Sequence, residues 1–431
     1  MSRSIAIVGR PNVGKSTLFN RLTETRRAIV SNHPGLTRDR QYGTAKINNQ
    51  DVILIDTGGI GNPKTPIEML MEKQAGLALK EAQIIIFVID AKSGLTTTDE
   101  ILADKLRKLN KTILVVINKI DGQNLETACV DFYKLGLGEN LAISAEHNIG
   151  ITELKNAIIK KLPETVVSAL QSNAIKITFV GRPNVGKSTL VNRILGEERV
   201  IVHTQPGTTR DSIFIDFKRH NKDYILVDTA GIRRRSKIHD KVEKFSIIKT
   251  LRAISATDVV VFLIDATENV TDQDLKLLGF ILEEGKALVI AINKWDNLLP
   301  RQRDKIKNEL KRRLDFLDFA SIHFISAMHG TGVGNLFNAI NKAYASATKE
   351  LNTPELNRIL ERAVQTHQPP LIHEHEIRLL YAHAGHKAPP TIIIHGTRVK
   401  ALPNNYRKYL EHFFRKALHL SGTPVNVIFK S

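Results

Sequence analysis

The sequence predicts two tandem copies of a doubly wound α/β domain with a mostly parallel sheet, followed by a small α+β domain. The first observation is a repeat: the nine residues GRPNVGKST stand at Gly9–Thr17 and again at Gly181–Thr189, 172 positions later (181 − 9). The second is that each copy alternates short β-branched runs with helix-length segments. A chain of 431 residues is also too long for one compact core, which favours several domains.

Four further motifs repeat in the same order and at nearly constant spacing, so the whole domain is duplicated. They are PGLTRD and PGTTRD at 34–39 and 206–211, DTGGI and DTAGI at 56–60 and 228–232, NKID and NKWD at 118–121 and 293–296, and SAE and SAM from 144 and 326. We therefore expect a first domain at residues 1–165, a linker at 166–174, a second domain at 175–350 and a third domain at 351–431.

The first copy contains the alternation most clearly. Strands are expected at Ile5–Val8, Val52–Ile55, Ile84–Ile89 and Ile113–Ile117, and helices at Pro66–Glu81, Thr98–Leu109 and Thr152–Leu162. Strands separated by helix-length segments imply right-handed crossovers and a mostly parallel sheet. The motifs follow the strand ends, and ligands bind at that carboxyl edge in such sheets.

The second copy opens with a strand at Ile175–Val180 and closes with a helix near Asn335–Thr348. The third domain then begins with a helix whose capping residue is expected to be Thr353, with Pro354 at the first helical position. Its further elements are expected as strands at Ile377–Ala382, Thr391–His395 and Val425–Phe429 and a helix at Tyr406–Leu418. This α-β-β-α-β piece contains no phosphate-loop motif.

Composition excludes several classes of protein. One cysteine excludes an intramolecular disulfide framework and a cysteine-built metal site. No apolar run approaches the ~20 residues of a membrane-spanning helix, and the five apolar residues before Gly9 are too few for a signal peptide. We therefore expect a cytoplasmic protein. The net charge of +18 favours polyanionic partners such as nucleic acid or an anionic membrane, with a solubility surface as the alternative.

The repeated nine residues have the spacing of a phosphate-binding loop, Gly-x-x-x-x-Gly-Lys-Ser. The glycines let backbone N–H groups surround a polyphosphate at a helix N-terminus, where the helix dipole also favours negative charge. Lys15 and Lys187 would reach the β- and γ-phosphates, and Ser16 and Ser188 would hold Mg²⁺. A glycine-rich turn before a helix is the alternative, but two copies in register argue against it.

Asp56 and Asp228 each end a β-branched strand and begin a D-x-x-G motif. A carboxylate at this place would hold the metal through a water molecule, while the N–H of Gly59 or Gly231 approaches the γ-phosphate. The motif is weak alone, because it is common in turns. Between a phosphate loop and the next motif it is a strong signal.

The Asn-Lys-x-Asp motif selects the base. Guanine offers N1–H and an exocyclic amine as adjacent donors, and the carboxylate of Asp121 or Asp296 accepts both. Adenine lacks this donor pair and would leave the carboxylate unpaired. The asparagine would tie neighbouring loops together, the lysine stem would cover the ring, and the Ser-Ala backbone would contact the guanine carbonyl. The sequence therefore predicts GTP or GDP at both sites.

This ordered set of motifs resembles the translation-factor-like class of small P-loop GTPases. Within that class, the two tandem domains and the small basic third domain are similar to the double-domain GTPases of ribosome assembly, over nearly the whole chain. The segments GRPNVGKST, PGTTRD, DTAGIRRR and NKWD carry the similarity. The resemblance implies a GTPase that binds ribosomal RNA of the large subunit and acts in ribosome assembly. It also implies a KH-like third domain.

The resemblance further implies roles for residues in and after the phosphate loops. Thr37 and Thr209 would be switch threonines that ligate Mg²⁺ only when the γ-phosphate is present, in loops that order and disorder. Ile60 and Ile232 stand where Ras-like enzymes have a water-orienting glutamine, which implies slow intrinsic hydrolysis. In GTPases resembling this one, a phosphate-loop asparagine ligates K⁺ near the bridging oxygen, here Asn12 or Asn184. Alternatively, each asparagine only caps the turn.

The assignments can be collected by role. The nucleotide-binding residues of the first copy are Gly9, Arg10, Pro11, Asn12, Val13, Gly14, Lys15, Ser16, Asp56, Thr57, Gly58, Gly59, Ile60, Asn118, Lys119, Ile120, Asp121, Ser144 and Ala145. Those of the second copy are Gly181, Arg182, Pro183, Asn184, Val185, Gly186, Lys187, Ser188, Asp228, Thr229, Ala230, Gly231, Ile232, Asn293, Lys294, Trp295, Asp296, Ser326 and Ala327. The catalytic residues are Asn12, Lys15, Thr37 and Gly59 with Asn184, Lys187, Thr209 and Gly231, and the metal ligands are Ser16, Thr37 and Asp56 with Ser188, Thr209 and Asp228.

Two basic regions of the chain could contribute to binding a partner. The run Arg233–Lys244 follows the second D-x-x-G motif, where a nucleotide-sensitive loop could present or withdraw an RNA-binding face; a solvated charged face is the alternative. The third domain is basic but lacks the G-x-x-G loop with which KH domains clamp RNA, so packing against the second copy or shape-based RNA contact both stay open. Its histidines, among them His373, His375, His383 and His386, are expected to be ordinary surface residues.

Three functions share these motifs. The favoured one is a nucleotide-gated switch that binds the large ribosomal subunit and its rRNA, as a monomer, without DNA or membrane as partner. The second is a GTPase of tRNA modification or a membrane-recruited GTPase, although the chain has neither a cysteine motif nor an amphipathic membrane helix. The third is a gated interaction module that hardly hydrolyses GTP.

Overall fold

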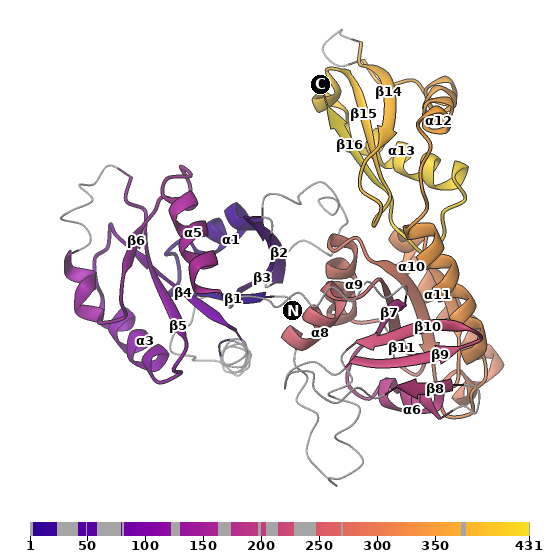
Figure 1. Cartoon of the computed structure of the whole chain (residues 1–431), viewed down its shortest axis with the longest axis horizontal. Helices are drawn as coiled ribbons and strands as arrows, with labels where there is room; N and C mark the ends of the chain where they lie inside the picture. The colour runs from indigo at the N-terminus through magenta and orange to yellow at the C-terminus, as the bar shows by residue number, and fades with distance from the viewer. Residues whose placement is uncertain are drawn as a thin grey trace. The chain divides into compact units, whose positions relative to one another are not determined.

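The computed structural model describes residues 3–23, 42–48, 50–57, 79, 82–121, 130–162, 174–196, 200–203, 214–227, 247–268, 270–371 and 376–430. They belong to two compact units (Figure 1). The first unit holds a six-stranded sheet, and the second holds a seven-stranded sheet and a three-stranded sheet. Within the described ranges, no helix is long and apolar enough to cross a membrane.

The first sheet has the strand order β2-β3-β1-β4-β5-β6. Its strands are β1 (Arg3–Val8), β2 (Tyr42–Ile47), β3 (Gln50–Asp56), β4 (Ile84–Asp90), β5 (Thr112–Asn118) and β6 (Asn140–Ala142). All neighbouring pairs run parallel except β2 and β3, so the mostly parallel sheet is confirmed. The edge strands β2 and β6 were not among the predicted strands, because neither is a β-branched run.

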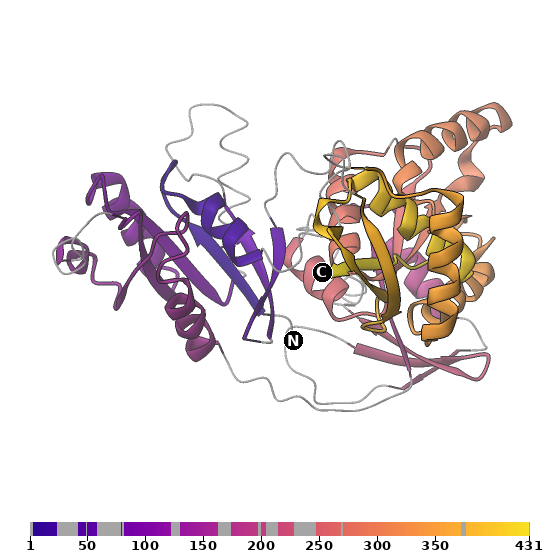
Figure 2. The same cartoon turned by 90° about the horizontal axis from the view of Figure 1, so that it is seen from above.

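Helices cover both faces of this sheet (Figures 1 and 2). On one face, α1 (Lys15–Thr23) and α5 (Ile151–Lys161) pack their apolar residues against β1, β3 and β4. On the other face, α3 (Thr97–Arg107) packs beside the short helix η2 (Val130–Leu135). Every residue of β4 is buried for this reason.

The second sheet has the order β13-β12-β11-β7-β10-β9-β8. Its strands are β7 (Ile175–Val180), β8 (Val200–His203), β9 (Phe214–Arg219), β10 (Lys222–Val227), β11 (Val259–Asp265), β12 (Ala287–Asn293) and β13 (Ser321–Phe324). Only β8–β9 and β9–β10 are antiparallel. The helices are α6 (Lys187–Leu195), α8 (Ile247–Ser255), α9 (Asp272–Glu283), η4 (Trp295–Asn297), α10 (Pro300–Arg313), η5 (Asp315–Leu317) and α11 (Val333–Ala347).

The third domain has the predicted α-β-β-α-β order. Its elements are α12 (Thr353–Thr366), β14 (Arg378–Ala384), β15 (Thr391–Thr397), η6 (Val399–Ala401), α13 (Asn404–Ala417) and β16 (Asn426–Lys430). Both long helices pack on one face of the sheet around one apolar cluster. One detail was wrong: α12 is preceded by Asn352 in extended conformation, so Thr353 is its first helical residue and not its cap.

The third domain is joined to the domain of the seven-stranded sheet by backbone hydrogen bonds at Gly422. The N–H of Leu288 donates to the Gly422 carbonyl at 2.7 Å, and the Gly422 N–H donates to the carbonyl of Phe319 at 2.8 Å. Gly422 has a φ of +73°, and a Cβ there would lie 2.5 Å from the Cβ of Ala343.

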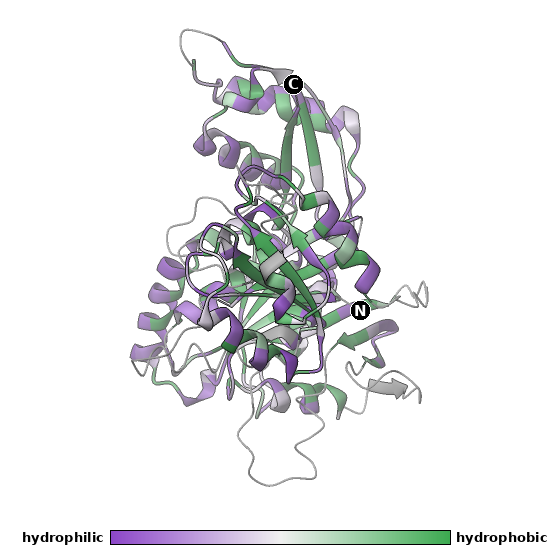
Figure 3. Ribbon diagram, turned by 90° about the vertical axis from the view of Figure 1, so that its left-hand side faces the viewer, coloured by the Kyte–Doolittle hydropathy of each residue, from purple (hydrophilic) through white to green (hydrophobic). Residues whose placement is uncertain are grey.

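Figure 3 shows the apolar strands of the sheets in green between helices that carry hydrophilic residues. The exact domain boundaries remain predictions.

Candidate functional site

Both phosphate loops lie between a strand of the sheet centre and the helix that follows it, β1–α1 and β7–α6. A Cβ on Gly9 would lie 2.3 Å from the carbonyl oxygen of Val88, and one on Gly181 would lie 2.4 Å from that of Leu263. These glycines are therefore required by the close approach of the next strand. The asparagines Asn12 and Asn184 have left-handed φ values of 66° and 64°.

The two loop lysines lie within their own loops. Lys15 is buried, and its Nζ donates to the carbonyl of Arg10 at 2.7 Å. Burial lowers the pKa of Lys15, against the opposing attraction of the Asp56 carboxylate. In the second copy, Nζ of Lys187 donates to the carbonyls of Gly181 and Arg182 at 2.9 and 2.6 Å. Both ammonium groups are held by backbone carbonyls at the floor of the loop.

The first copy brings its serine and aspartate together. Oγ of Ser16 donates to Oδ2 of Asp56 at 2.8 Å, and Asp56 is buried at the end of β3. Hydroxyl and carboxylate oxygens are the ligands that Mg²⁺ prefers, so this donor set fits the ion. Across the described residues, no group of three or more His, Cys, Asp or Glu side chains forms a metal site. The partner oxygens of such an ion would have to include water and phosphate.

A buried asparagine ties two loops together in each copy. Nδ2 of Asn118 donates to the carbonyl of Val13 at 2.9 Å, and its Oδ1 accepts from the N–H of Ala145 at 3.0 Å. Asn293 makes the same pair of bonds to Val185 and Ala327, at 2.7 and 2.8 Å. The predicted bridging role of the asparagine is therefore present in both copies.

Each motif lysine pairs with the aspartate that ends a neighbouring strand. Nζ of Lys119 donates to the carbonyl of Asn12 and to Oδ2 of Asp90, both at 2.7 Å. Lys294 pairs in the same way with Asp265 at the end of β11. Burial works to raise the pKa of Asp265, but hydrogen bonds from Lys294 and Thr267 hold it below its ordinary value. Both lysines have left-handed backbones, with φ values of 69° and 62°.

The carboxylates that end the two motifs keep their charge. Hydrogen bonds from Lys92 and then Ser144 lower the pKa of Asp121 to about 2. A hydrogen bond with Ser326 lowers the pKa of Asp296. Each aspartate is thus a carboxylate at neutral pH and an acceptor for a pair of donors.

Comparison with known proteins agrees with this duplicated geometry. A family model described as a 50S ribosome-binding GTPase matches residues 4–119 and again 176–294. A second model, the C-terminal KH-domain-like part of EngA bacterial GTPases, matches residues 350–430. The chain is 55% identical over 426 residues to GTPase Der of Legionella pneumophila (strain Lens), covering 99% of this chain and 92% of that protein. It is 51% identical over 445 residues to GTPase Der of Alteromonas mediterranea, with coverages of 99% and 92%.

The chain belongs to the GTPase Der family. Its two large domains are GTPase domains, and its third domain is KH-like. Among solved structures, the Era protein of Aquifex aeolicus bound to GDP.AlF4- matches at 18% identity and a TM-score of 0.34, covering 100% of this chain and 93% of that one.

Some predicted site residues of this Der family member lie outside the described residues. They are Thr37, Gly58, Gly59, Ile60, Thr209, Asp228, Thr229, Ala230, Gly231 and Ile232, together with the Arg233–Lys244 run. Of the remaining ones, Ile120 is buried, and the Trp295 ring packs on Phe324 with 4.2 Å between centroids. Thr57 donates from Oγ1 to the carbonyl of Ile7 at 2.8 Å, which fixes the end of β3 beside β1.

Sequence reasoning missed one acidic residue that supports each phosphate loop. Thr96 and Asp99 form a capping box at the start of α3, and Oδ2 of the buried Asp99 lies 3.3 Å from Nε of Arg10. In the second domain, Asp274 of the α9 capping box lies 3.0 Å from Nε of Arg182. The T-x-x-D pattern repeats in the sequence at the same spacing as the base-selecting motif, 175 positions (293 − 118), and could have revealed the pair.

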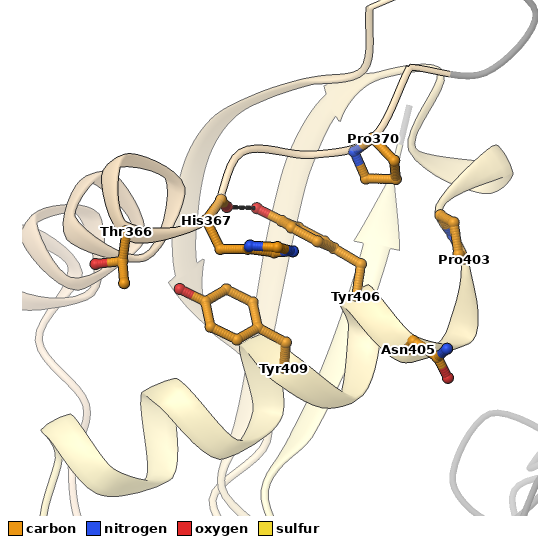
Figure 4. A pocket seen from close by; sticks show the side chains of 7 residues that line it. All are labelled: Thr366, His367, Pro370, Pro403, Asn405, Tyr406 and Tyr409. Atoms are coloured by element: carbon orange, nitrogen blue, oxygen red, sulfur yellow. Dashed lines mark hydrogen bonds between the residues drawn. The ribbon is translucent and has the colours of Figure 1, made fainter.

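The KH-like domain has an aromatic pocket between the end of α12 and the start of α13 (Figure 4). Its volume is about 430 Å³, and it is lined by Thr366, His367, Pro370, Pro403, Asn405, Tyr406 and Tyr409. The His367 ring stacks on Tyr406, with 5.7 Å between centroids and 25° between planes. The hydroxyl of Tyr406 donates to the carbonyl of His367 at 2.6 Å, which holds the loop after α12 against α13.

Proposed function

We propose that the chain binds GTP or GDP with Mg²⁺ at one site in each GTPase domain and hydrolyses GTP slowly, as a switch that controls its binding to the large ribosomal subunit. The observation that carries the nucleotide proposal is the matched geometry of Asn118 and Asn293. Each asparagine joins the phosphate loop to the Ser-Ala loop with two hydrogen bonds of 2.7–3.0 Å. These bonds fix the position of the phosphate loop relative to the Ser-Ala loop, so both can contact one nucleotide.

Base selection would rest on Asp121 and Asp296. Both are carboxylates at neutral pH, because hydrogen bonds lower their pKa values. A carboxylate accepts the N1–H and amine donors of guanine together, and it would be left unpaired against adenine. The stem of Lys119, whose ammonium group is bonded to the phosphate loop at Asn12, and that of Lys294, which pairs with Asp265, would cover the ring.

Hydrolysis would depend on charge rather than on a water-orienting side chain. Backbone N–H groups of the two loops, together with Lys15 and Lys187, would stabilise the negative charge that develops on the transferred phosphoryl group. Mg²⁺ held by Ser16 and Asp56 would supply further positive charge. Turnover would be slow without a partner, because Ile60 and Ile232 cannot orient water, and K⁺ at Asn12 and Asn184 would raise it.

The partner we propose is rRNA of the large subunit, in ribosome assembly, bound by a monomeric cytoplasmic chain. The family model that matches both GTPase domains is described as a 50S ribosome-binding GTPase, which supports this choice. The chain carries a net charge of +18. Part of that charge lies on α10, whose exposed cations are Arg301, Lys305, Lys307, Lys311 and Arg312. Arg301, Lys305 and Arg312 follow helical spacing and share one face.

Co-sedimentation with large ribosomal subunits across a salt series, in GTP, GDP and a non-hydrolysable analogue, tests the partner. If phosphate contacts carry binding, log affinity falls linearly with log salt, with a slope of about −0.7 to −0.9 per neutralised phosphate. Arg301→Glu, Lys305→Glu and Arg312→Glu together should flatten that slope. Arg233→Glu, Arg234→Glu and Arg235→Glu together should abolish the difference between the GTP and GDP forms.

The matched control changes the same charge in the first unit, with Lys108→Glu, Lys160→Glu and Lys161→Glu, all exposed in the structure. It should bind subunits more tightly than the α10 variant does. An affinity for the subunits that does not change with salt, or no association in any nucleotide state, would contradict the rRNA proposal and favour a protein partner.

A further inference from the structure

The two copies differ in the group that contacts the base-selecting carboxylate. In the first copy, Oδ2 of Asp121 accepts from Nζ of Lys92 at 2.5 Å, and Oδ1 accepts from Oγ of Ser144 at 3.0 Å. In the second copy, Ser326 hydrogen-bonds to Asp296 as Ser144 does to Asp121, but in place of a lysine the Nε2 atom of His329 lies 3.4 Å from Oδ2 of Asp296. Both oxygens of Asp121 are therefore engaged by donors of the chain itself.

The residue that corresponds to Lys92 is Thr267, and the two start from the same backbone position. The N–H of Lys92 donates to Oδ1 of Asp90 at 2.9 Å, and the N–H of Thr267 donates to Oδ1 of Asp265 at 2.9 Å. The Thr267 hydroxyl turns back to the same Asp265 oxygen at 2.7 Å. The copies thus share one turn, from which only the longer lysine side chain reaches the base-selecting carboxylate.

We propose that Lys92 is an affinity-determining residue of the first site, where it competes with guanine for Asp121 and makes this site the weaker of the two. The inference rests on the proposed guanine-nucleotide function. Guanine needs both carboxylate oxygens for its two donors, so binding requires Lys92 to release or share Oδ2. At the second site a threonine takes this position, and among the described residues Asp296 has Ser326 and the more distant His329 beside it in place of a lysine.

The expected size of the effect follows from the exposure of the pair. The Lys92 side chain is 52% exposed and that of Asp121 28%. Ion pairs in contact with water are weak and are screened by salt, so displacement of the lysine costs little. We expect Lys92→Thr to tighten GDP binding at the first site about three- to fivefold, and Thr267→Lys to weaken it at the second site by a similar factor.

The test titrates a fluorescent GDP analogue into the full chain with one site disabled at a time. Lys187→Ala leaves the first site for the comparison of Lys92 with Lys92→Thr, and Lys15→Ala leaves the second for Thr267→Lys. Lys160→Thr on α5 makes the same charge change away from Asp121 and serves as the control. The difference in GDP affinity between the two sites should also decrease as the salt concentration rises, because salt screens the Lys92–Asp121 ion pair.

The possible outcomes distinguish the competition by Lys92 from the proposed guanine-nucleotide binding on which it rests. Tighter binding in Lys92→Thr, weaker binding in Thr267→Lys and no change in Lys160→Thr support the competition. Unchanged or weaker binding in Lys92→Thr overturns it, even when both sites bind GDP. If the intact chain binds no GDP, or if Lys187→Ala leaves two binding equivalents, the assignment of the two nucleotide sites itself is wrong.

Discussion

Gly14 and Asn118 lie so close together that no side chain fits on the glycine: a Cβ there would be 2.3 Å from Nδ2 of Asn118. The same relationship recurs between Gly186 and Asn293, at 2.2 Å. Both glycines also have left-handed φ values, +91° and +98°. The second phosphate-loop glycine is therefore required by its backbone and by the asparagine that bridges two loops.

Gly14→Ala should destabilise the first GTPase domain and remove nucleotide binding at its site. The added methyl group would displace Asn118 from its bonds to Val13 and Ala145 and force an unfavourable φ, at a cost of about 2 kcal/mol or more in the free energy of unfolding. Denaturant unfolding and GDP titration measure both effects. Gly138→Ala is the control: its φ is +101°, but nothing lies within 4 Å of the added Cβ, so only the smaller backbone cost is expected. Equal losses in the two variants would contradict the role of Asn118.

Asp121→Asn and Asp296→Asn should each move their own site from guanine toward xanthine nucleotides. Xanthine replaces the exocyclic amine of guanine with a carbonyl, to which the new amide donates. Titration of each variant with labelled GTP and XTP measures the change, and the unaltered site in the same chain is the internal control. Full GTP affinity at the altered site would show that the aspartate does not read the base.

GTP hydrolysis should be faster in potassium chloride than in sodium chloride at equal ionic strength. Asn12 and Asn184 are placed in the phosphate loops, and neither Ile60 nor Ile232 orients water. Turnover in the two salts is the measurement. Asn12→Gly combined with Asn184→Gly keeps the left-handed backbone without strain, removes both amides and should abolish the difference. Equal rates in both salts for the wild-type chain would point to another source of charge.

Tyr406, one of the two tyrosines at the aromatic pocket of the KH-like domain, should ionise late. Burial raises the pKa of Tyr406 to about 12, whereas an unfolded tyrosine ionises near pH ~10. The folded state keeps its proton when the unfolded state has lost it. This contribution to stability is therefore complete below pH ~10 and is lost as the pH rises through about 12.

Spectrophotometric titration of the tyrosines, with circular dichroism to follow folding, tests this expectation. Tyr406→Phe should remove the late step and lower the free energy of unfolding by about 1 kcal/mol, because the 2.6 Å hydrogen bond to the carbonyl of His367 is lost. Tyr381→Phe, an exposed tyrosine, should leave the late step in place. Ionisation of all tyrosines in one step before the chain unfolds would contradict the burial of Tyr406.

Several parts of the fold were predictable because their cause is local. Buried parallel strands are short β-branched runs, so Ile175–Val180 was predicted with the bounds of β7. The duplication was visible because identical motifs recur in one order. The edge strands β2 and β13 were not predicted. The β2 sequence YGTAKI is not a β-branched run, and the residues of β13 are only partly buried, so that strand needs no continuous apolar run. The cap at Asn352 was misplaced by one residue, since threonine and asparagine both suit that position.

By itself, the sequence determined the duplicated GTPase architecture, the order of the motifs and the kind of group that each motif provides. Only the tertiary structure decided which of these groups meet. It showed that Ser16 hydrogen-bonds to Asp56, that Asn118 bridges two loops, and that Arg10 pairs with the capping box of α3. It also showed that Lys92 reaches Asp121, whereas Thr267 turns back to its own loop. The physical reason is that these contacts join residues far apart in the chain, and the packing of strands and loops at one sheet edge sets their distances.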